Sequence, residues 1–148
     1  RSRGLGDVYK RQSHDAAVQI LKGQEFVPIN GVNLVVSREE LVELQKKTNS
    51  LSVHDSIFDY IVTLIEKTRN NEYFALGASP RGANSLLRMS RAMALLSGRN
   101  YVVPDDIEAV FTAVLGHRVK LSSRARANGF TVDTALEEVR KSVKLPRT

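Results

Sequence analysis

Two stretches of sequence decide the fold: residues 55–68 read DSIFDYIVTLIEKT, and residues 79–97 read SPRGANSLLRMSRAMALLS. In both, apolar side chains recur every three or four residues, which is the period of one helix face. The second stretch opens with Ser-Pro, a favoured N-cap followed by a favoured first helical residue. We therefore predict two helices, each with one face in the core. The predicted inward-facing residues are Ile57, Ile61, Leu64, Ile65 and Thr68 in the first helix, and Ala83, Leu86, Leu87, Ser90, Met93, Ala94 and Ser97 in the second.

The sequence after these stretches predicts further helices. Residues 104–116 open with Pro-Asp-Asp, which suits a first helical turn because acidic side chains stabilise the positive end of a helix. Gly116 can end that helix, and Gly98 can end the one before it. Residues 131–143 show the period of a last amphipathic helix. Tyr60 falls outside the core stripe of the first helix, so we expect it on another face.

Two pairs of residues predict helix starts upstream. Ser37 and Glu40 have the spacing of a capping box, in which a serine and a glutamate satisfy each other's backbone N–H groups. Ser52 and Asp55 have the same spacing ahead of the helix over residues 55–68. The pattern predicts that both pairs cap helices.

The N-terminal part carries weaker signals. Residues 13–21 can form a short helix, with Ser13 as its cap and Gly23 as its stop. Residues 26–36 read FVPINGVNLVV, in which proline and Asn-Gly provide turns between β-branched residues, so we predict a strand-rich connector.

Together these signals predict an all-α (mainly α) protein, a helical bundle with short extended connectors. The 148 residues suffice for one compact domain with a core. The apolar fraction of 42% and the charged fraction of 26% are ordinary for a globular protein.

Composition excludes several classes of protein. No apolar run approaches the roughly 20 residues that span a bilayer, so we expect no membrane association and a cytoplasmic location. Cysteine is absent, which excludes disulfides and thiolate metal sites. The three histidines lie far apart and share no metal-ligand spacing, so we predict no metal site in this chain.

The net charge of +6 suggests a nucleic-acid-binding protein, but its distribution weakens that hypothesis. Half of the charge lies in residues 1–12, RSRGLGDVYKRQ, where four cations accompany one acid. These residues lack an initial Met and any amphipathic period, and we interpret them as a non-native or disordered leader. The basic residues at 118–126 have no aromatic neighbours that could stack on bases.

The most informative stretch for chemistry is residues 76–82, LGASPRG. Its two glycines have the spacing of a phosphate loop, but Ala83-Asn84 follow where such a loop carries Lys-Ser/Thr. The chain also lacks an Asp-Glu pair after an apolar strand. We therefore do not expect this chain alone to hydrolyse ATP by the P-loop route.

Arg81 occupies an unusual position in that stretch. It falls in the first turn of a predicted helix, where the N–H groups already create positive potential and a further cation is mildly unfavourable. A bound anion would reverse this, because helix N–H groups and a guanidinium would then converge on it. From the residues alone, a solvated surface arginine remains the alternative.

A series of short blocks runs through the chain in a recognisable order. The blocks are Glu40-Leu41 with Leu44-Gln45, Asp59-Tyr60-Ile61-Val62, Thr68-Arg69, residues 76–82, Ser90-Arg91-Ala92, residues 98–102, Pro104-Asp105-Asp106-Ile107 and Val114-Leu115-Gly116-His117-Arg118. In this order and spacing, residues 37–148 resemble the C-terminal lid of the MoxR family of AAA+ ATPases, relatives of the magnesium-chelatase ATPase subunit.

The resemblance implies a domain organisation in which most of the catalytic residues lie outside this chain. It makes residues 37–148 a helical AAA+ lid domain, and it makes residues 13–36 a segment that links the lid to an ATPase core upstream. The phosphate loop, the acidic magnesium ligand and the arginine finger of the family would all lie in that core. One face of the lid would pack on the core.

The resemblance also implies site residues. It makes Arg81 the sensor-2 arginine, which reaches the γ-phosphate of ATP in the full-length protein, with Ser79 and Gly82 beside it in the nucleotide site. Gly82 stands where many relatives have alanine. ATP would be the cofactor, with Mg²⁺ held by residues outside this chain.

The function implied is that of a full-length ATPase. Such a protein forms a homo-oligomeric ring and acts as a chaperone-like remodelling or maturation factor, often on a partner with a von Willebrand factor A domain. Two alternatives remain from the residues: a stand-alone basic helical module that binds nucleic acid, and a small adaptor that binds a partner through its helix faces. Arg69 could face a neighbouring subunit or lie on a solvated helix face.

Overall fold

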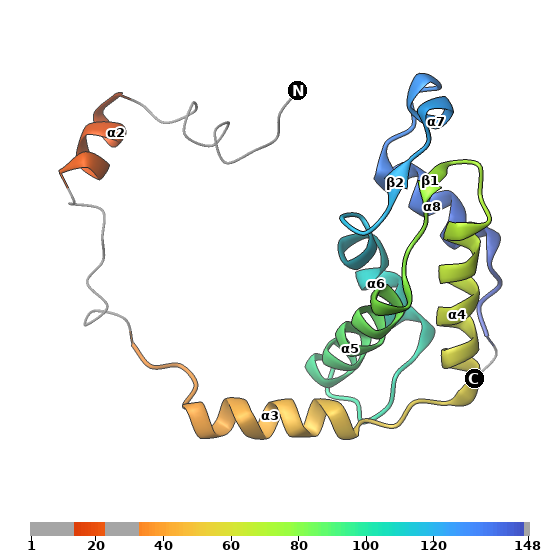
Figure 1. Ribbon diagram of the computed structural model, residues 1–148. Helices are drawn as coiled ribbons and strands as arrows, with labels where there is room; N and C mark the ends of the chain where they lie inside the picture. Colours follow the sequence, from red (N-terminus) through yellow and green to blue (C-terminus); the bar gives the residue numbers. More distant parts are fainter. Residues whose placement is uncertain (1–13, 23–32, 147–148) are drawn as a thin grey trace. The chain divides into compact units, whose positions relative to one another are not determined.

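The computed structural model describes residues 14–22 and 33–146 (Figure 1). Helices dominate this part of the chain, which confirms the all-α prediction. The elements are α2 (His14–Leu21), α3 (Arg38–Ser50), α4 (Asp55–Arg69), β1 (Phe74–Leu76), α5 (Pro80–Leu96), α6 (Pro104–Leu115), β2 (Lys120–Leu121), α7 (Ser123–Ala127) and α8 (Val132–Ser142).

The chain divides into two units, Arg1–Glu40 and Leu41–Thr148. In the first unit α2 forms where the sequence predicts it, while Ser13 and Gly23 lie outside the described residues. Most of the predicted strand-rich connector also lies outside them. Its described part, residues 33–36, forms no strand, so the prediction is wrong there. Its apolar residues are exposed and find no strand to pair with in the described chain.

One of the two predicted capping boxes is confirmed. The N–H of Ser37 donates to the Glu40 carboxylate at 2.8 Å, and the N–H of Glu40 donates to Ser37 Oγ at 3.1 Å. The second is wrong: α4 is capped by His54, whose Nδ1 accepts the N–H of Ser56 at 3.2 Å. Ser52 instead forms a short parallel bridge with Tyr101. A backbone partner far along the chain has therefore displaced the local cap.

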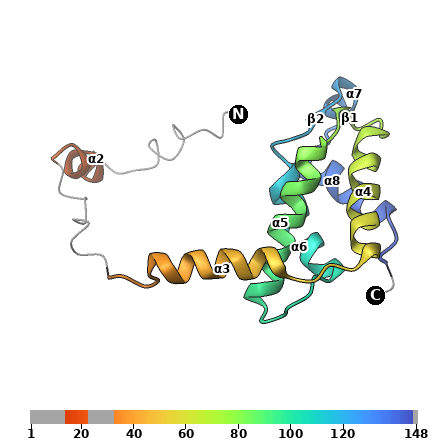
Figure 2. The ribbon, with the colours of Figure 1, turned by 60° about the horizontal axis from the view of Figure 1, so that its bottom comes forward.

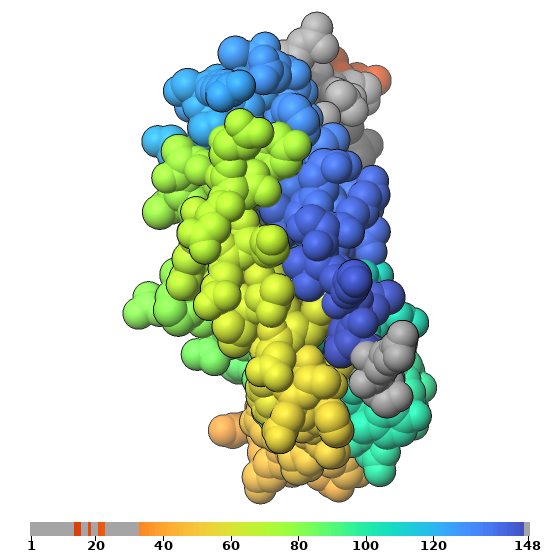
Figure 3. All heavy atoms as spheres, turned by 90° about the vertical axis from the view of Figure 1, so that its right-hand side faces the viewer, coloured from red at the N-terminus to blue at the C-terminus, as the bar shows by residue number. Residues whose placement is uncertain are grey.

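Four helices of the second unit enclose one core. Figures 1 and 2 show α5 against α6 and α4 beside α5, and Figure 3 shows α8 lying along α4. The predicted stripe of α4 is fully buried, and so are Leu86, Ser90 and Ala94 of α5. Two predictions are wrong: Ser97 is exposed because it lies at the end of α5, and Tyr60 is buried because α8 covers the face of α4 that it lies on.

Helix α5 ends as predicted, at a glycine. Gly98 has a φ of 73°, and the N–H groups of Gly98 and Arg99 donate back to the carbonyls of Leu95 and Ala94 at 2.9 Å each. These two bonds form a Schellman motif, which satisfies the last carbonyls of the helix. The chain can therefore turn sharply toward α6.

The turn into α6 is held by a partly buried ion pair. Arg99 donates two hydrogen bonds to the carboxylate of Asp106, at 2.8 and 2.6 Å, and Asp106 also accepts the N–H of Val103 at 2.9 Å. Asp106 is only 4% exposed. The predicted helix-start role of this residue is confirmed, and the ion pair adds a link between the end of α5 and the start of α6.

A two-stranded antiparallel ribbon, which the sequence did not predict, leads into α5. Phe74 of β1 pairs with Leu121 of β2, and Leu76 pairs with Lys120 across an irregular register. Ser122 strengthens the ribbon by donating its hydroxyl to the carbonyl of Glu72 at 2.8 Å. The strands have two or three residues each, which is too short for period-2 alternation to appear. The ribbon fixes where the chain leaves β1 for α5.

A polar network joins α4, α6 and α8. The hydroxyl of Tyr60 donates to Glu108 at 3.4 Å, and Arg140 pairs with Glu108 at 2.7 Å and with Glu137 at 2.6 Å. Burial raises the pKa of Tyr60 to about 12, and the negative charge of Glu108 adds to the effect. In the folded protein the hydroxyl of Tyr60 therefore stays protonated at pH values at which an exposed tyrosine would ionise.

We expect Tyr60→Phe to make stability less sensitive to high pH. An unfolded chain loses the tyrosine proton near pH 10, whereas the folded protein keeps it to about 12. The unfolded state thus binds fewer protons in this window, so wild-type stability falls as pH rises, by roughly 1 kcal/mol at pH 11 from this group. Urea titrations of both chains at neutral pH and near pH 11 would measure the difference. Equal losses in the two chains would contradict the raised pKa.

Candidate functional site

The candidate site is the start of α5, where the sequence places Ser79, Arg81 and Gly82. Ser79 is the N-cap, with extended backbone angles of φ −86° and ψ 167°, and Pro80 is the first helical residue. The N–H of Gly82 donates to the carbonyl of Ser79 at 2.8 Å and lies 3.4 Å from Ser79 Oγ. No acidic side chain occupies the first turn. The positive end of the helix is therefore not neutralised from within it.

Arg81 is the exposed charge of this site. Its side chain lies at the surface, and its backbone carbonyl accepts the hydroxyl of Ser85 at 3.0 Å. Among residues 33–146, no carboxylate forms an ion pair with it. The guanidinium is thus available to an anion from outside this part of the chain.

Gly82 faces the interior. A Cβ at this position would lie 3.3 Å from Leu115 Cδ2 and 3.7 Å from Arg118 Cδ. The backbone of α5 therefore approaches the end of α6 closely at this point. Ser79 and Gly82 bond to each other and shape the turn, while Arg81 is the side chain of the three that projects a charge.

The loop before α5 touches the end of α4 at Gly77. A Cβ on Gly77 would lie 2.6 Å from the carbonyl oxygen of Thr68 and 2.6 Å from the Cα of Arg69. Both are backbone atoms, which cannot move aside as a side chain can. Only glycine fits here, because the two backbones are in direct contact.

Two side chains of α4 hold the next residue. The N–H of Ala78 donates to Thr68 Oγ1 at 2.9 Å, and Arg69 Nε donates to the carbonyl of Ala78 at 2.7 Å. Ala78 and Thr68 are both fully buried. Sequence reasoning missed these contacts and left Arg69 as a surface or subunit residue. The available signal was a polar threonine within an otherwise apolar stripe.

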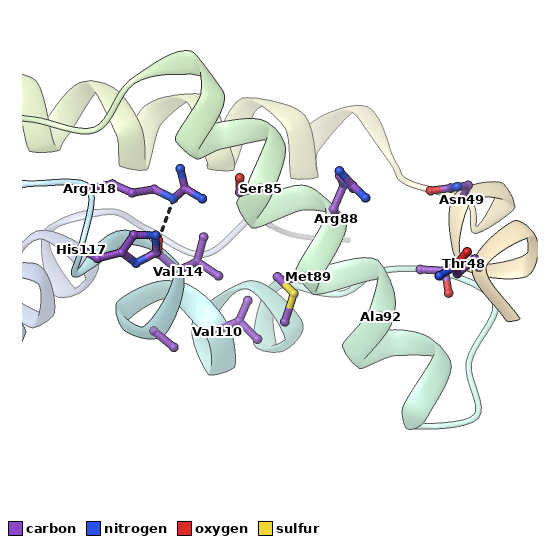
Figure 4. Close-up of a pocket in the computed structure, with 12 residues that line it drawn as sticks. Thr48, Asn49, Ser85, Arg88, Met89, Ala92, Val110, Val114, His117 and Arg118 are labelled. Atoms are coloured by element: carbon purple, nitrogen blue, oxygen red, sulfur yellow. Dashed lines mark hydrogen bonds between the residues drawn. The ribbon is translucent and has the colours of Figure 1, made fainter. Parts of the chain in front are cut away.

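A groove of about 710 Å³ runs beside the site along α5 and α6 (Figure 4). Ser85 and Met89 of α5, which line it, lie one and two turns beyond Arg81 on the same helix face. Val110 and Val114 of α6 provide apolar lining from the other side.

The charge of the groove is positive. Arg88 and Arg118 both line it, and none of its lining residues is acidic. Arg118 also donates Nε to the carbonyl of Val114 at 3.1 Å, marked by the dashed line in Figure 4. This bond gives a cation at the end of α6 a structural role. The groove suits an apolar surface that carries negative charge.

Two further properties of the described residues bear on function. No three His, Asp or Glu side chains within residues 14–22 and 33–146 come together in a way that could hold a metal ion. In the same ranges, no helix is both long and apolar enough to cross a membrane. The feature of the described residues that bears on function is therefore a cationic helix start beside a groove.

We expect Gly77→Ala to destabilise the protein and to disturb the start of α5. Its methyl group would overlap backbone atoms of α4, and overpacking of this kind costs roughly 1–3 kcal/mol. Gly129→Ala is a useful comparison, because Gly129 has a φ of 81° with no atom near its Cβ position, so it tests backbone strain without a clash. Thermal unfolding measures both. Equal stability of Gly77→Ala and the wild type would contradict the close contact.

Comparisons with known proteins agree with the fold. The profile of the AAA lid domain family matches residues 66–139, half of the chain. This range includes the loop, the start of α5 and most of the groove. The matched region therefore contains every residue of the candidate site named above.

Two relatives match most of this chain. YeaC of Bacillus subtilis (strain 168) is 36% identical over 119 residues, which cover 80% of this chain and 37% of that protein. Chaperone MoxR1 of Mycobacterium tuberculosis is 32% identical over 122 residues, covering 76% of this chain and 32% of that protein.

A solved structure extends the comparison. The crystal structure of a protein assigned as an ATPase, from Cytophaga hutchinsonii, has a TM-score of 0.73 and 26% identity, covering 91% of this chain and 44% of that one. The chain thus spans less than half the length of each of these three proteins. It belongs to the AAA lid domain family, as the lid region of a MoxR-type AAA+ protein.

Proposed function

We propose that this chain is the lid of a longer MoxR-type ATPase and that Arg81 contacts the γ-phosphate of ATP bound where the lid meets the core. The observation that carries the proposal is the position of Arg81. It is an exposed cation, without an ion pair among the described residues, in the first turn of a helix that has no acid there. A cation at this position costs a few tenths to about 1 kcal/mol in the absence of an anion. A phosphate group would turn that cost into an attraction.

The chemistry of the site follows from the residues present. A guanidinium presents several N–H donors in a rigid plane that matches two phosphate oxygens, and it keeps its charge at any physiological pH. As negative charge develops on the phosphate oxygens, Arg81 would stabilise it. Ser79 and Gly82 would hold the turn that aims Arg81. ATP with Mg²⁺ supplies the bond that is broken, and the metal ligands would come from the core.

The groove supports a second part of the proposal. Its lining continues the face of α5 that carries Arg81, and it combines apolar side chains of α5 and α6 with Arg88 and Arg118 and with no acidic residue. We propose that the ATPase core of the same protein packs there, which would bring nucleotide and Arg81 together. Residues 37–148 would then act as one lid, and residues 13–36 as its link to the core.

The activity of the whole protein is an extension of this proposal. One relative is named as a chaperone, and we propose that the longer protein forms a homo-oligomeric ring that remodels or matures a partner carrying a von Willebrand factor A domain. The basic residues at 118–126 give little support to the nucleic-acid alternative. Arg118 bonds to a helix carbonyl, and Arg124 lies 3.6 Å from Glu72.

The test is Arg81→Ala in the full-length protein that carries this lid. We expect the turnover of ATP to fall by about 100-fold or more, as for other groups that stabilise developing charge, with Arg81→Lys recovering only part of it. Arg126→Ala is the matched control, because Arg126 is another exposed helical arginine, on α7. It should leave turnover unchanged.

Two results would count against the proposal. Turnover of Arg81→Ala within twofold of the wild type would remove Arg81 from the nucleotide site. Binding of a DNA oligonucleotide by the isolated chain, steeply weakened by salt and unaffected by Arg81→Ala, would favour the nucleic-acid alternative. Fluorescence anisotropy with a labelled oligonucleotide measures that binding.

A further inference from the structure

We propose that Thr68 and Arg69 are positioning residues, which aim Arg81 and make it move together with α4. We call the contacts of these two residues with the loop before α5 the clamp, and its geometry rests on those contacts alone. Its consequence for ATP hydrolysis rests on the proposed role of Arg81. Neither residue touches the nucleotide in this proposal. They act on the loop that carries the arginine.

Thr68 is the buried half of the clamp. Its side chain is fully buried, yet its hydroxyl both donates to the carbonyl of Ile65 at 2.7 Å and accepts the N–H of Ala78 at 2.9 Å. A buried polar group is costly unless it is hydrogen-bonded. Valine would fill the same space in this apolar stripe without that requirement. The presence of a hydroxyl at this position is therefore explained by its hydrogen bond with the N–H of Ala78, which has no other partner in the loop.

Arg69 is the exposed half. Its Nε donates to the carbonyl of Ala78 at 2.7 Å, and a bond from a charged donor is stronger than a neutral one. Consecutive residues of α4 thus hold both backbone groups of Ala78. Gly77 adds a third constraint, because its Cα packs directly on the backbone of Thr68 and Arg69.

Little freedom remains between the clamp and Arg81. Only Ser79 and Pro80 separate Ala78 from Arg81, and the proline ring fixes its own φ. Ser79 is further fixed as the N-cap of α5. The direction in which Arg81 leaves the lid is therefore set by the last turn of α4 as well as by its own helix.

The clamp also extends the reach of the site. Helix α4 packs on α8, and its Tyr60 bonds to Glu108 of α6, which pairs with Arg140 of α8. A phosphate that draws Arg81 toward itself would pull on the Ala78 loop and hence on α4. The helices α4, α6 and α8 would then follow as a unit, so that nucleotide state is transmitted across the lid.

The test compares Thr68→Val with Thr68→Ser. Valine keeps the shape and removes the hydroxyl, whereas serine keeps the hydroxyl. Thr63→Val is the matched control on the same helix, because the Thr63 hydroxyl bonds only to the local carbonyl of Asp59, at 2.8 Å. In the chain itself, we expect amide exchange of Ala78 to accelerate about tenfold in Thr68→Val, in line with the loss of one hydrogen bond, and to stay unchanged in the other two variants.

In the full-length protein, we expect Thr68→Val to lower kcat for ATP about fivefold to tenfold with KM within about twofold, since the arginine is misaimed rather than absent. Thr68→Ser should restore kcat. A role limited to stability would lower the melting temperature without this separation of kcat from KM. Arg69→Met, a substitution at an exposed residue, gives a second test should Thr68→Val fold poorly, and it should shift the amide resonances of residues 79–82.

The outcomes separate this proposal from the one before it. Unchanged Ala78 exchange in Thr68→Val, or unchanged 79–82 resonances in Arg69→Met, would overturn the clamp whatever Arg81 does. A changed loop with normal kcat in Thr68→Val, while Arg81→Ala is inactive, would overturn the aiming role. Normal kcat in Arg81→Ala would overturn the nucleotide role of Arg81 and leave the clamp to be judged by the exchange data alone.

Discussion

The close approach of two backbones, at Gly77 and the last turn of α4, is the constraint on which the rest of this site depends. A side chain at Gly77 would collide with carbonyl and Cα atoms of α4, and without that contact neither Thr68 nor Arg69 could reach Ala78. The β1–β2 ribbon delivers the chain to this point, and α5 starts immediately after it. The exposed arginine is thus the end of a chain of contacts that begins in the core.

Helical periodicity predicted the helices well, because the burial of one helix face determines both the spacing of apolar residues in the sequence and the packing in the structure. Local rules predicted four features that the structure shows: the buried stripe of α4, the Ser79-Pro80 start of α5, its end at Gly98 and the capping box at Ser37. Three of the failures have one cause in common. Ser52, Tyr60 and the β1–β2 ribbon are each governed by partners about fifty residues away in sequence, and local patterns carry no information about such partners.

The candidate site was predictable in its position but not in its support. The Ser-Pro-Arg motif at a helix start is recognisable in the sequence, and it identifies Arg81 as the candidate residue. The residues that hold the turn do not show, because Thr68 looks like one more member of a core stripe and Arg69 like a surface cation. Their hydrogen bonds become visible only when α4 and the loop are placed against each other. Asp106 is similar: its place at a helix start was clear, and its ion pair with Arg99 was not.

The ribbon between β1 and β2 has a consequence for how the protein folds. The contacts of α5 with α6 join neighbours in the chain, so they can form early at little entropic cost. The ribbon and the bond from Ser122 to Glu72 close a loop of 50 residues, and that closure must wait until the intervening helices have collapsed. We therefore expect the stretch from Tyr73 to Ala78 to reach its native conformation late, so that a nascent chain would complete its helical core before it completes the turn that leads into α5.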